Sequence, residues 1–150
     1  MKDDFDKPID SFSGEYRWLS NFYHAPITYH GVEYISTEVA YQAAKACDDE
    51  TRLKFRGLNS SDAKKLGGEL PLVNIRPDWD MVRDSVMYEV CWLKFSTHPD
   101  LKEKLLATGD RELIEGNYWG DTYWGVYLGV GENMLGKTLM RIRSELRSQI

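Results

Sequence analysis

Hydrophobic residues recur with a helical period in the second half of this 150-residue chain. Five of them follow Pro77 at spacings of three and four: Trp79, Val82, Val86, Val90 and Leu93. This period predicts a helix over about residues 78–96 that buries one stripe of side chains. His98-Pro99 should end that helix, and a shorter helix should run on to about Ala107.

A second strong period predicts a final helix that starts after Asn133. Its buried stripe is expected to contain Leu135, Leu139, Ile142 and Leu146. Its basic side chains should lie mostly elsewhere on the helix surface; they are Lys137, Arg141, Arg143 and Arg147.

Polar residues are also spaced helically in an alanine-rich segment that should form a helix from about Glu38 to Cys47, capped by Ser36 or Thr37. At about 100° per residue, Glu38, Gln42 and Lys45 share one stripe, with small residues on the opposite face. The polar stripe fits an ordinary solvated helix surface, and it also fits one wall of a cleft.

Alternating and turn-forming residues predict a small number of strands. Residues 27–34 should form a hairpin around His30-Gly31, and further strands are expected over residues 16–23 and 112–115. Short helices should connect them over residues 49–55 and 61–66, the second closed by Gly67-Gly68. The expected architecture is α+β: one domain over residues 1–150, with flexible residues 1–11 and a small, mainly antiparallel sheet surrounded by helices.

Charge and composition narrow the possible partners. The formal net charge of −5 provides no polybasic surface for long nucleic acids, although a local basic cluster can still bind a small anion. No apolar run is long enough to span a membrane and no secretory leader is visible, so we expect no membrane partner and a cytoplasmic location. Cys47 and Cys91 lack metal-ligand spacing and are expected to be buried free thiols.

Aromatic residues and glycines gather in the segment from Asn117 to Gly125. Trp119, Asp121 and Trp124 in it could line a ligand site, but a hairpin with core tryptophans and an Asp-Thr turn explains the pattern equally well. Gly129-Val130-Gly131-Glu132-Asn133 then leads into the final helix, where free N–H groups could hold a phosphate. A plain loop with an Asn cap also fits that segment.

Four ordered blocks of the sequence together resemble the NADAR family, also described as YbiA-like, over roughly residues 12–147. The matching residues are Arg17-Trp18-Leu19-Ser20-Asn21-Phe22; Ser36-Thr37-Glu38 through Tyr41-Gln42 to Lys45-Ala46; Asn117, Trp119-Gly120-Asp121 and Trp124-Gly125; and Gly129, Gly131, Asn133, Leu135-Gly136, Leu139-Met140 and Arg143.

This resemblance implies an N-glycosidase. One branch of the family hydrolyses phosphoribosylaminopyrimidine intermediates of riboflavin biosynthesis and releases ribose 5-phosphate, and another removes ADP-ribose from guanine bases in nucleic acid. A small phosphorylated ribosyl substrate is therefore expected, with nucleic acid as partner only in the second case. A binding module without turnover is a third possibility, which the combination of Glu38, Lys45 and Asp121 disfavours.

The chemistry of C–N cleavage assigns expected roles to the matching residues. Positive charge develops on the sugar, so a carboxylate can stabilise the transition state or activate water, and Glu38 is the first candidate. Lys45 could bind the phosphate or attack an opened sugar as a Schiff-base nucleophile, and Asp121 is a second carboxylate. The expected substrate-binding residues are Arg17, Asn21, Gln42, Trp119, Trp124 and Asn133. The cleavage needs only water, so neither a cofactor nor a metal is expected.

Overall fold

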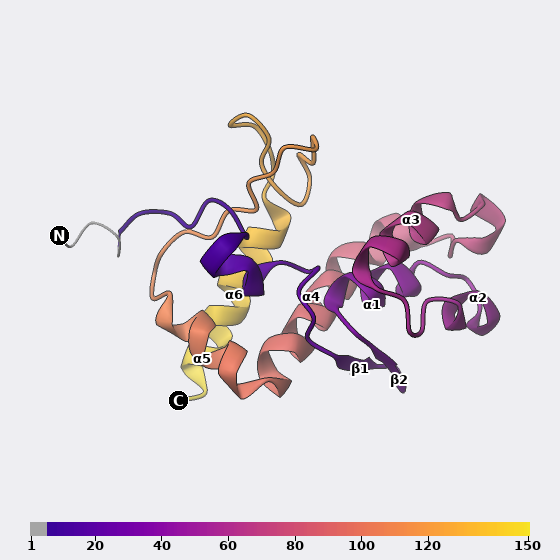
Figure 1. Cartoon of the computed structure of the whole chain (residues 1–150), viewed down its shortest axis with the longest axis horizontal. Helices are drawn as coiled ribbons and strands as arrows, with labels where there is room; N and C mark the ends of the chain where they lie inside the picture. Colours follow the sequence, from indigo (N-terminus) through magenta and orange to yellow (C-terminus); the bar gives the residue numbers. More distant parts are fainter. Residues whose placement is uncertain (1–5) are drawn as a thin grey trace. The chain divides into compact units, whose positions relative to one another are not determined.

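The computed structural model describes residues 6–150 and divides into two compact units. One unit contains Asn21–Thr97, and the other contains the chain up to Ser20 together with His98–Ile150. Helices and a two-stranded antiparallel sheet make up the described residues, which confirms the α+β class (Figure 1). None of the helices in the described part is both long and apolar enough to cross a membrane.

The sheet in the unit Asn21–Thr97 is the predicted hairpin. Its strands are β1 (Ile27–Tyr29) and β2 (Val32–Tyr34), with Ile27 opposite Tyr34. His30 and Gly31 both have positive φ, of 50° and 81°, as a tight two-residue hairpin turn requires. The side chains of Ile27, Tyr29 and Tyr34 are buried, so one face of this small sheet joins the core of the unit.

Helix α1 (Thr37–Ala44) begins as predicted, with the Ser36 hydroxyl accepting a hydrogen bond from the N–H of Val39. It ends three residues earlier than expected. The chain instead forms an antiparallel bridge between Ala46 and Ile75, because the flanking backbone groups bond across it. Cys47 therefore lies outside the helix and is exposed, and the prediction that it is buried was wrong.

Helix α3 (Ser60–Glu69) follows α2 (Asp49–Leu53) and packs beside α1. Gly67 and Gly68 were expected to end α3, but the helix continues through both of them. The physical reason is a tertiary contact, since Gly67 is buried at a close approach to α1. A short 3-10 turn, η3 (Leu72–Asn74), then leads to α4 (Trp79–Thr97).

Helix α4 confirms the longest predicted helix and packs against α1 and β1 in this unit (Figure 1). Its buried stripe is rotated from the predicted one, because Val82 and Leu93 are only partly buried. The fully buried residues are Trp79, Val86, Met87, Val90, Cys91, Lys94 and Phe95. Lys94 is thus a charged residue on the buried face of α4.

The other unit contains the 3-10 helix η2 (Gly14–Leu19), α5 (Pro99–Ala107) and α6 (Met134–Ser148). The strand expected over residues 16–23 was wrong: η2 covers its first half. Gly14 starts η2 with φ +58°, and the consecutive residues Trp18 and Leu19 are both buried, which strand alternation does not allow.

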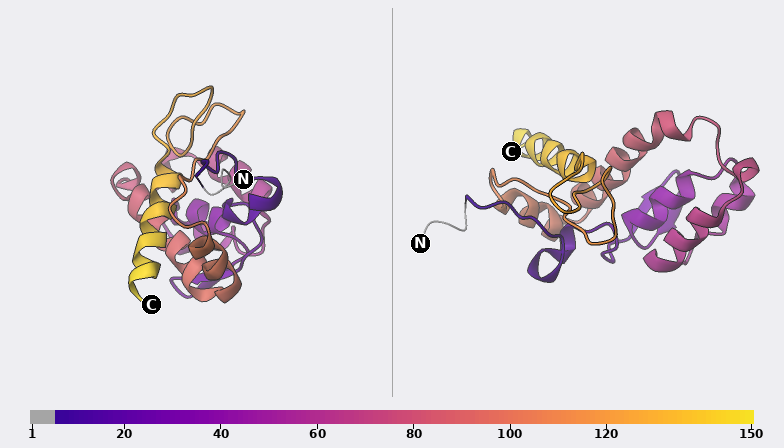
Figure 2. Two further views of the ribbon diagram at one scale, coloured as in Figure 1. Left: turned by 90° about the vertical axis from the view of Figure 1, so that its left-hand side faces the viewer. Right: turned by 90° about the horizontal axis from the view of Figure 1, so that it is seen from above.

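A long loop without helices connects α5 and α6, as Figures 1 and 2 show for residues of about 110–133. The strand expected over residues 112–115 is reduced to a single parallel bridge between Leu113 and Ile9, and within the described loop residues 117–125 form no hairpin strands. Ile9 is buried at this bridge, while the first five residues of the expected flexible start lie outside the described ones.

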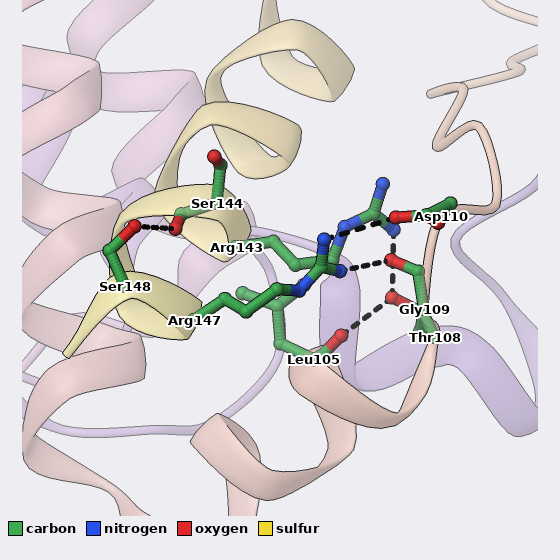
Figure 3. A network of polar contacts seen from close by, with 8 residues as sticks. All are labelled: Leu105, Thr108, Gly109, Asp110, Arg143, Ser144, Arg147 and Ser148. Atoms are coloured by element: carbon green, nitrogen blue, oxygen red, sulfur yellow. Dashed lines mark hydrogen bonds and ion pairs between the residues drawn. The ribbon is translucent and has the colours of Figure 1, made fainter. Parts of the chain in front are cut away.

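Helix α6 buries the predicted stripe of Leu135, Leu139, Ile142 and Leu146. Arg143 was expected on the surface but is buried, and its Nη1 donates to the Thr108 hydroxyl at 2.9 Å (Figure 3). Arg147 donates to the carbonyl oxygen of Gly109 and pairs with Asp110. Two arginines of α6 therefore bind the turn that follows α5 and satisfy groups at that helix end.

Candidate functional site

The carboxylate of Glu38 lies in the first turn of α1 and is almost completely buried, with 8% of the residue exposed. Its backbone N–H donates to the carbonyl oxygen of Asn21 at 3.1 Å, and its Oε2 accepts a hydrogen bond from Nε2 of Gln42 at 2.8 Å. A carboxylate at a helix N-terminus is favoured by the helix dipole, whereas burial opposes its charge. Glu38 is thus held in one orientation at a position largely closed to solvent.

Gln42 connects this carboxylate to an amine. Its Oε1 accepts from Nζ of Lys45 at 3.3 Å, and the same Nζ donates to the carbonyl oxygen of Gly67 at 3.1 Å. Burial lowers the pKa of Lys45 from its ordinary value, while the charge of Glu38 acts in the opposite direction. The structure therefore joins the three residues of the predicted stripe into one line of hydrogen bonds along α1.

Gly67 on α3 belongs to this arrangement, although sequence reasoning assigned it only to a helix end. A Cβ atom at this position would lie 1.9 Å from Oε1 of Gln42, so only glycine allows the observed approach. The signal in the sequence was a glycine inside a segment that could continue as a helix, which often marks close packing.

Asn21 anchors the start of α1 to α4. Its Oδ1 accepts from the Thr37 hydroxyl at 2.9 Å, and its Nδ2 lies 3.2 Å from Sδ of Met87. The thiol of Cys91 also approaches Oδ1, at 3.6 Å. These contacts occupy the buried amide with protein groups and fix the backbone next to Glu38.

Asp121 lies in the loop of the other unit and organises a turn. Its Oδ1 accepts from the N–H groups of Tyr123 and Trp124, at 3.0 and 2.9 Å. The Asn117 side chain accepts from the Asp121 N–H and donates to its carbonyl oxygen. The turn interpretation of this segment is therefore present in the structure, and a catalytic role for Asp121 stays a prediction.

Most of the N–H groups that lead into α6 are used within the protein, which favours the plain-loop interpretation over a phosphate site. The N–H groups of residues 132–135 donate to the carbonyl oxygens of residues 122–125, at 2.8 to 3.3 Å. Asn133 accepts from the Glu115 N–H and donates to the Leu113 carbonyl oxygen, each at 2.9 Å. Because its buried amide holds the chain together, we leave Asn133 out of the proposed site.

The remaining predicted residues, Arg17, Trp119 and Trp124, belong to the same unit as Asp121. Arg17 is exposed, and its Nη1 contacts the carbonyl oxygen of Gly14 at 3.3 Å. Trp119 is 52% exposed and packs edge-on to Tyr118, so part of its ring faces solvent. Trp124 is half-buried and packs edge-on to Tyr123. Their substrate-binding roles stay predictions.

A separate pocket of about 480 Å³ lies in the unit Asn21–Thr97 and includes none of the predicted site residues. It borders α1 only at Ala44, on the face opposite Glu38. The other lining residues are Tyr29, His30, Val32, Tyr34, Asp49, Arg52, Leu53 and Arg76. Within residues 6–150, no three His, Cys, Asp or Glu side chains are placed to hold a metal ion.

Comparison with known proteins supports the resemblance to the NADAR family that the four sequence blocks indicated. The NADAR domain model matches residues 9–147. An N-glycosidase of Nostoc punctiforme is 36% identical over 89% of this chain and 87% of its own length, and N-glycosidase YbiA of Escherichia coli is 34% identical over 91% and 85%. A riboflavin biosynthesis protein of Vibrio vulnificus is 39% identical over 87% of this chain, which spans 35% of that protein.

The NMR structure of Escherichia coli YbiA is similar in fold. It has a TM-score of 0.84 and 33% sequence identity, and the match covers 96% of this chain and 87% of that one. A family model that spans nearly the whole sequence and relatives above 30% identity lead to one conclusion: the chain belongs to the NADAR domain family.

Proposed function

We propose that this chain hydrolyses the N-glycosidic bond between ribose 5-phosphate and the base of phosphoribosylaminopyrimidine intermediates of the riboflavin pathway. The enzyme class is established by its relatives: the chain is an N-glycosidase. The pyrimidine substrate is supported by the relative in Vibrio vulnificus that is named a riboflavin biosynthesis protein. A binding module without turnover is set aside, because the relatives that match most of this chain are enzymes.

The observation that carries the proposal is the buried Glu38 carboxylate held by Gln42. As the C–N bond breaks, the anomeric carbon gains positive charge and the electron pair leaves with the base. An ionised carboxylate on a dry surface stabilises that charge strongly, and it can take a proton from the water that adds to the sugar. The hydrogen bond from Gln42 to Oε2 fixes the orientation of this carboxylate.

Lys45 serves in this proposal as a substrate ligand. Its amine already donates to Gln42 and Gly67, which fix its direction and leave an N–H of the ammonium form for an oxygen of the ribose or its phosphate. In the other unit, the resemblance implies a phosphate ligand at Arg17, rings for the base at Trp119 and Trp124, and a second carboxylate at Asp121. These four assignments rest on the family resemblance.

The test is release of ribose 5-phosphate from phosphoribosylaminopyrimidine by purified protein without added cofactor. Glu38→Gln keeps the size of the side chain and an acceptor for Gln42, so the variant should fold while kcat falls about a hundredfold or more. An ADP-ribosylated guanine oligonucleotide is assayed in parallel. Turnover of the oligonucleotide alone would replace the proposed substrate, and an unchanged kcat in Glu38→Gln would remove Glu38 from the mechanism.

A further inference from the structure

Lys94 is the most completely buried charged residue on α4, with 1% of its surface exposed. Its Nζ lies 5.0 Å from the ring centroid of Phe95 and 5.7 Å from that of Tyr23. Contacts with aromatic faces offset only part of the cost of burying an ammonium group, and a buried anion nearby offsets much more. The contacts of α4 point to the Glu38 carboxylate as this anion.

The face of α4 that carries Lys94 contacts Asn21, whose backbone bonds to Glu38. Met87, Cys91 and Lys94 follow one another at spacings of four and three residues and share that face. Met87 and Cys91 both contact the side chain of Asn21. The carbonyl oxygen of Asn21 in turn accepts the N–H of Glu38 at 3.1 Å. The same short segment therefore borders Glu38 on α1 and the Lys94 face on α4.

The charges of Lys94 and Glu38 both affect the pKa of the Cys91 thiol. Burial raises its pKa to about 12; the positive charge of Lys94 acts to lower it, and the negative charge of Glu38 acts to raise it. One buried sulfur atom is thus within electrostatic reach of the amine and of the carboxylate. Because Glu38, Cys91 and Lys94 are all buried, an attraction between the two charges would be weakly screened by solvent.

We propose that Lys94 is a positioning residue whose buried ammonium group keeps the Glu38 carboxylate ionised for glycosidic cleavage. The inference rests on the proposed function in one respect, namely that Glu38 is the acting carboxylate. Two other lysines lie near this part of the unit. Lys45 reaches Glu38 through Gln42, and Lys64 of α3 lies over the ring of Phe22. Of these amines, Lys94 is the most deeply buried, so its charge is the least screened by solvent.

The carboxylate can be followed directly in the free protein by carbon-13 NMR of labelled glutamates, with the Glu38 signal assigned through Glu38→Gln. The wild-type titration of Glu38 supplies the reference pKa value for the Lys94 variants. Lys94→Met, which fills the same volume without charge, should raise this pKa by about one unit or more. Lys94→Arg should keep it close to the wild-type value, and Lys104→Met, at an exposed lysine of α5, should leave it unchanged.

The pH profile of kcat/KM supplies the functional measurement. Its acid limb should move upward with the Glu38 pKa in Lys94→Met, which lowers activity about tenfold at pH values below the wild-type midpoint and leaves the plateau at higher pH. If Lys94→Met does not fold, Lys94→Gln takes its place, and an unshifted Glu38 titration in that variant would overturn the proposal. An unshifted titration in a folded Lys94→Met protein would also overturn it. Because the titration requires no turnover, a shifted Glu38 in a protein inactive on the pyrimidine would refute the proposed substrate and leave the effect of Lys94 intact.

Discussion

Lys45 is a residue on which two opposing effects act. Burial disfavours its charged form and lowers its pKa, whereas Glu38 and the acceptors on Gln42 and Gly67 favour the charge. Burial is the larger effect, since the net direction is downward. The folded protein therefore binds its proton at Lys45 more weakly than the unfolded chain does.

This difference predicts a pH dependence of stability. Between the lowered pKa of folded Lys45 and its ordinary value of 10.5, the unfolded chain carries more protons than the folded protein. The contribution of Lys45 to the free energy of unfolding therefore increases as the pH rises through that window. Lys45→Met lacks this gain. We expect the stability difference between wild type and Lys45→Met to move in favour of wild type from pH 7 to 10.5, measured by urea unfolding.

Lys104→Met serves as the matched control, because this exposed lysine of α5 should show no such trend. A constant difference between wild type and Lys45→Met over the whole range would contradict a lowered pKa at Lys45.

At the scale of elements, the approach of α3 to α1 shapes the candidate site. The two adjacent glycines of α3 differ completely in their surroundings: a Cβ at Gly67 would collide with Gln42, while a Cβ at Gly68 would meet nothing within 4 Å. Both positions are helical, so intrinsic helix propensity would favour alanine at each. Tertiary contact decides which of them must be glycine.

Gly67→Ala and Gly68→Ala should therefore have opposite effects. Gly68→Ala should stabilise the protein by up to about 1 kcal/mol through helix propensity. Gly67→Ala should destabilise it by about 1–3 kcal/mol through overpacking, and it should lower kcat because Gln42 must leave its place between Glu38 and Lys45. Urea unfolding and the glycosidase assay measure the two effects. Equal stabilisation by both alanines would show that α3 does not press on Gln42.

The elements also show which predictions the sequence could support. Periodic spacing located α4 and α6, because burial of one face leaves a regular pattern. The boundary at His98-Pro99 located α5, and the turn residues His30-Gly31 located the hairpin. The stripe on α1 was predictable for the same reason. Residues 16–23 and 112–115 were misassigned as strands, because short apolar runs do not distinguish a strand from a 3-10 turn or a single bridge. The burial of Lys94 and Arg143 depends on contacts between elements distant in sequence, which no local pattern encodes.

On the scale of the whole molecule, the two cysteines have opposite environments. Cys47 is exposed, and Cys91 is fully buried with a pKa raised to about 12 by burial. The thiolate is the reactive form, so Cys91 should be inert in the folded protein. The cysteines were predicted as a pair of buried thiols, and the structure separates them.

Thiol titration with Ellman's reagent at pH 8 should therefore detect one reactive cysteine in the native protein and two in urea. Cys47→Ser should abolish the native reaction and keep the one seen in urea. Rapid reaction of both thiols under native conditions would indicate that the core around Asn21 and Met87 opens readily, and it would weaken the argument for a dry region beside Glu38.

The hydrogen bonds at the start of α6 limit how the preceding loop can move. Four successive N–H groups, of residues 132–135, are bound by four successive carbonyl oxygens of residues 122–125. The loop cannot lift away without exposing the first turn of the helix at the same time. Residues 122–125 and the helix start therefore form one cooperative opening unit, and movement of Trp124 with this segment requires local unfolding rather than rotation about a hinge.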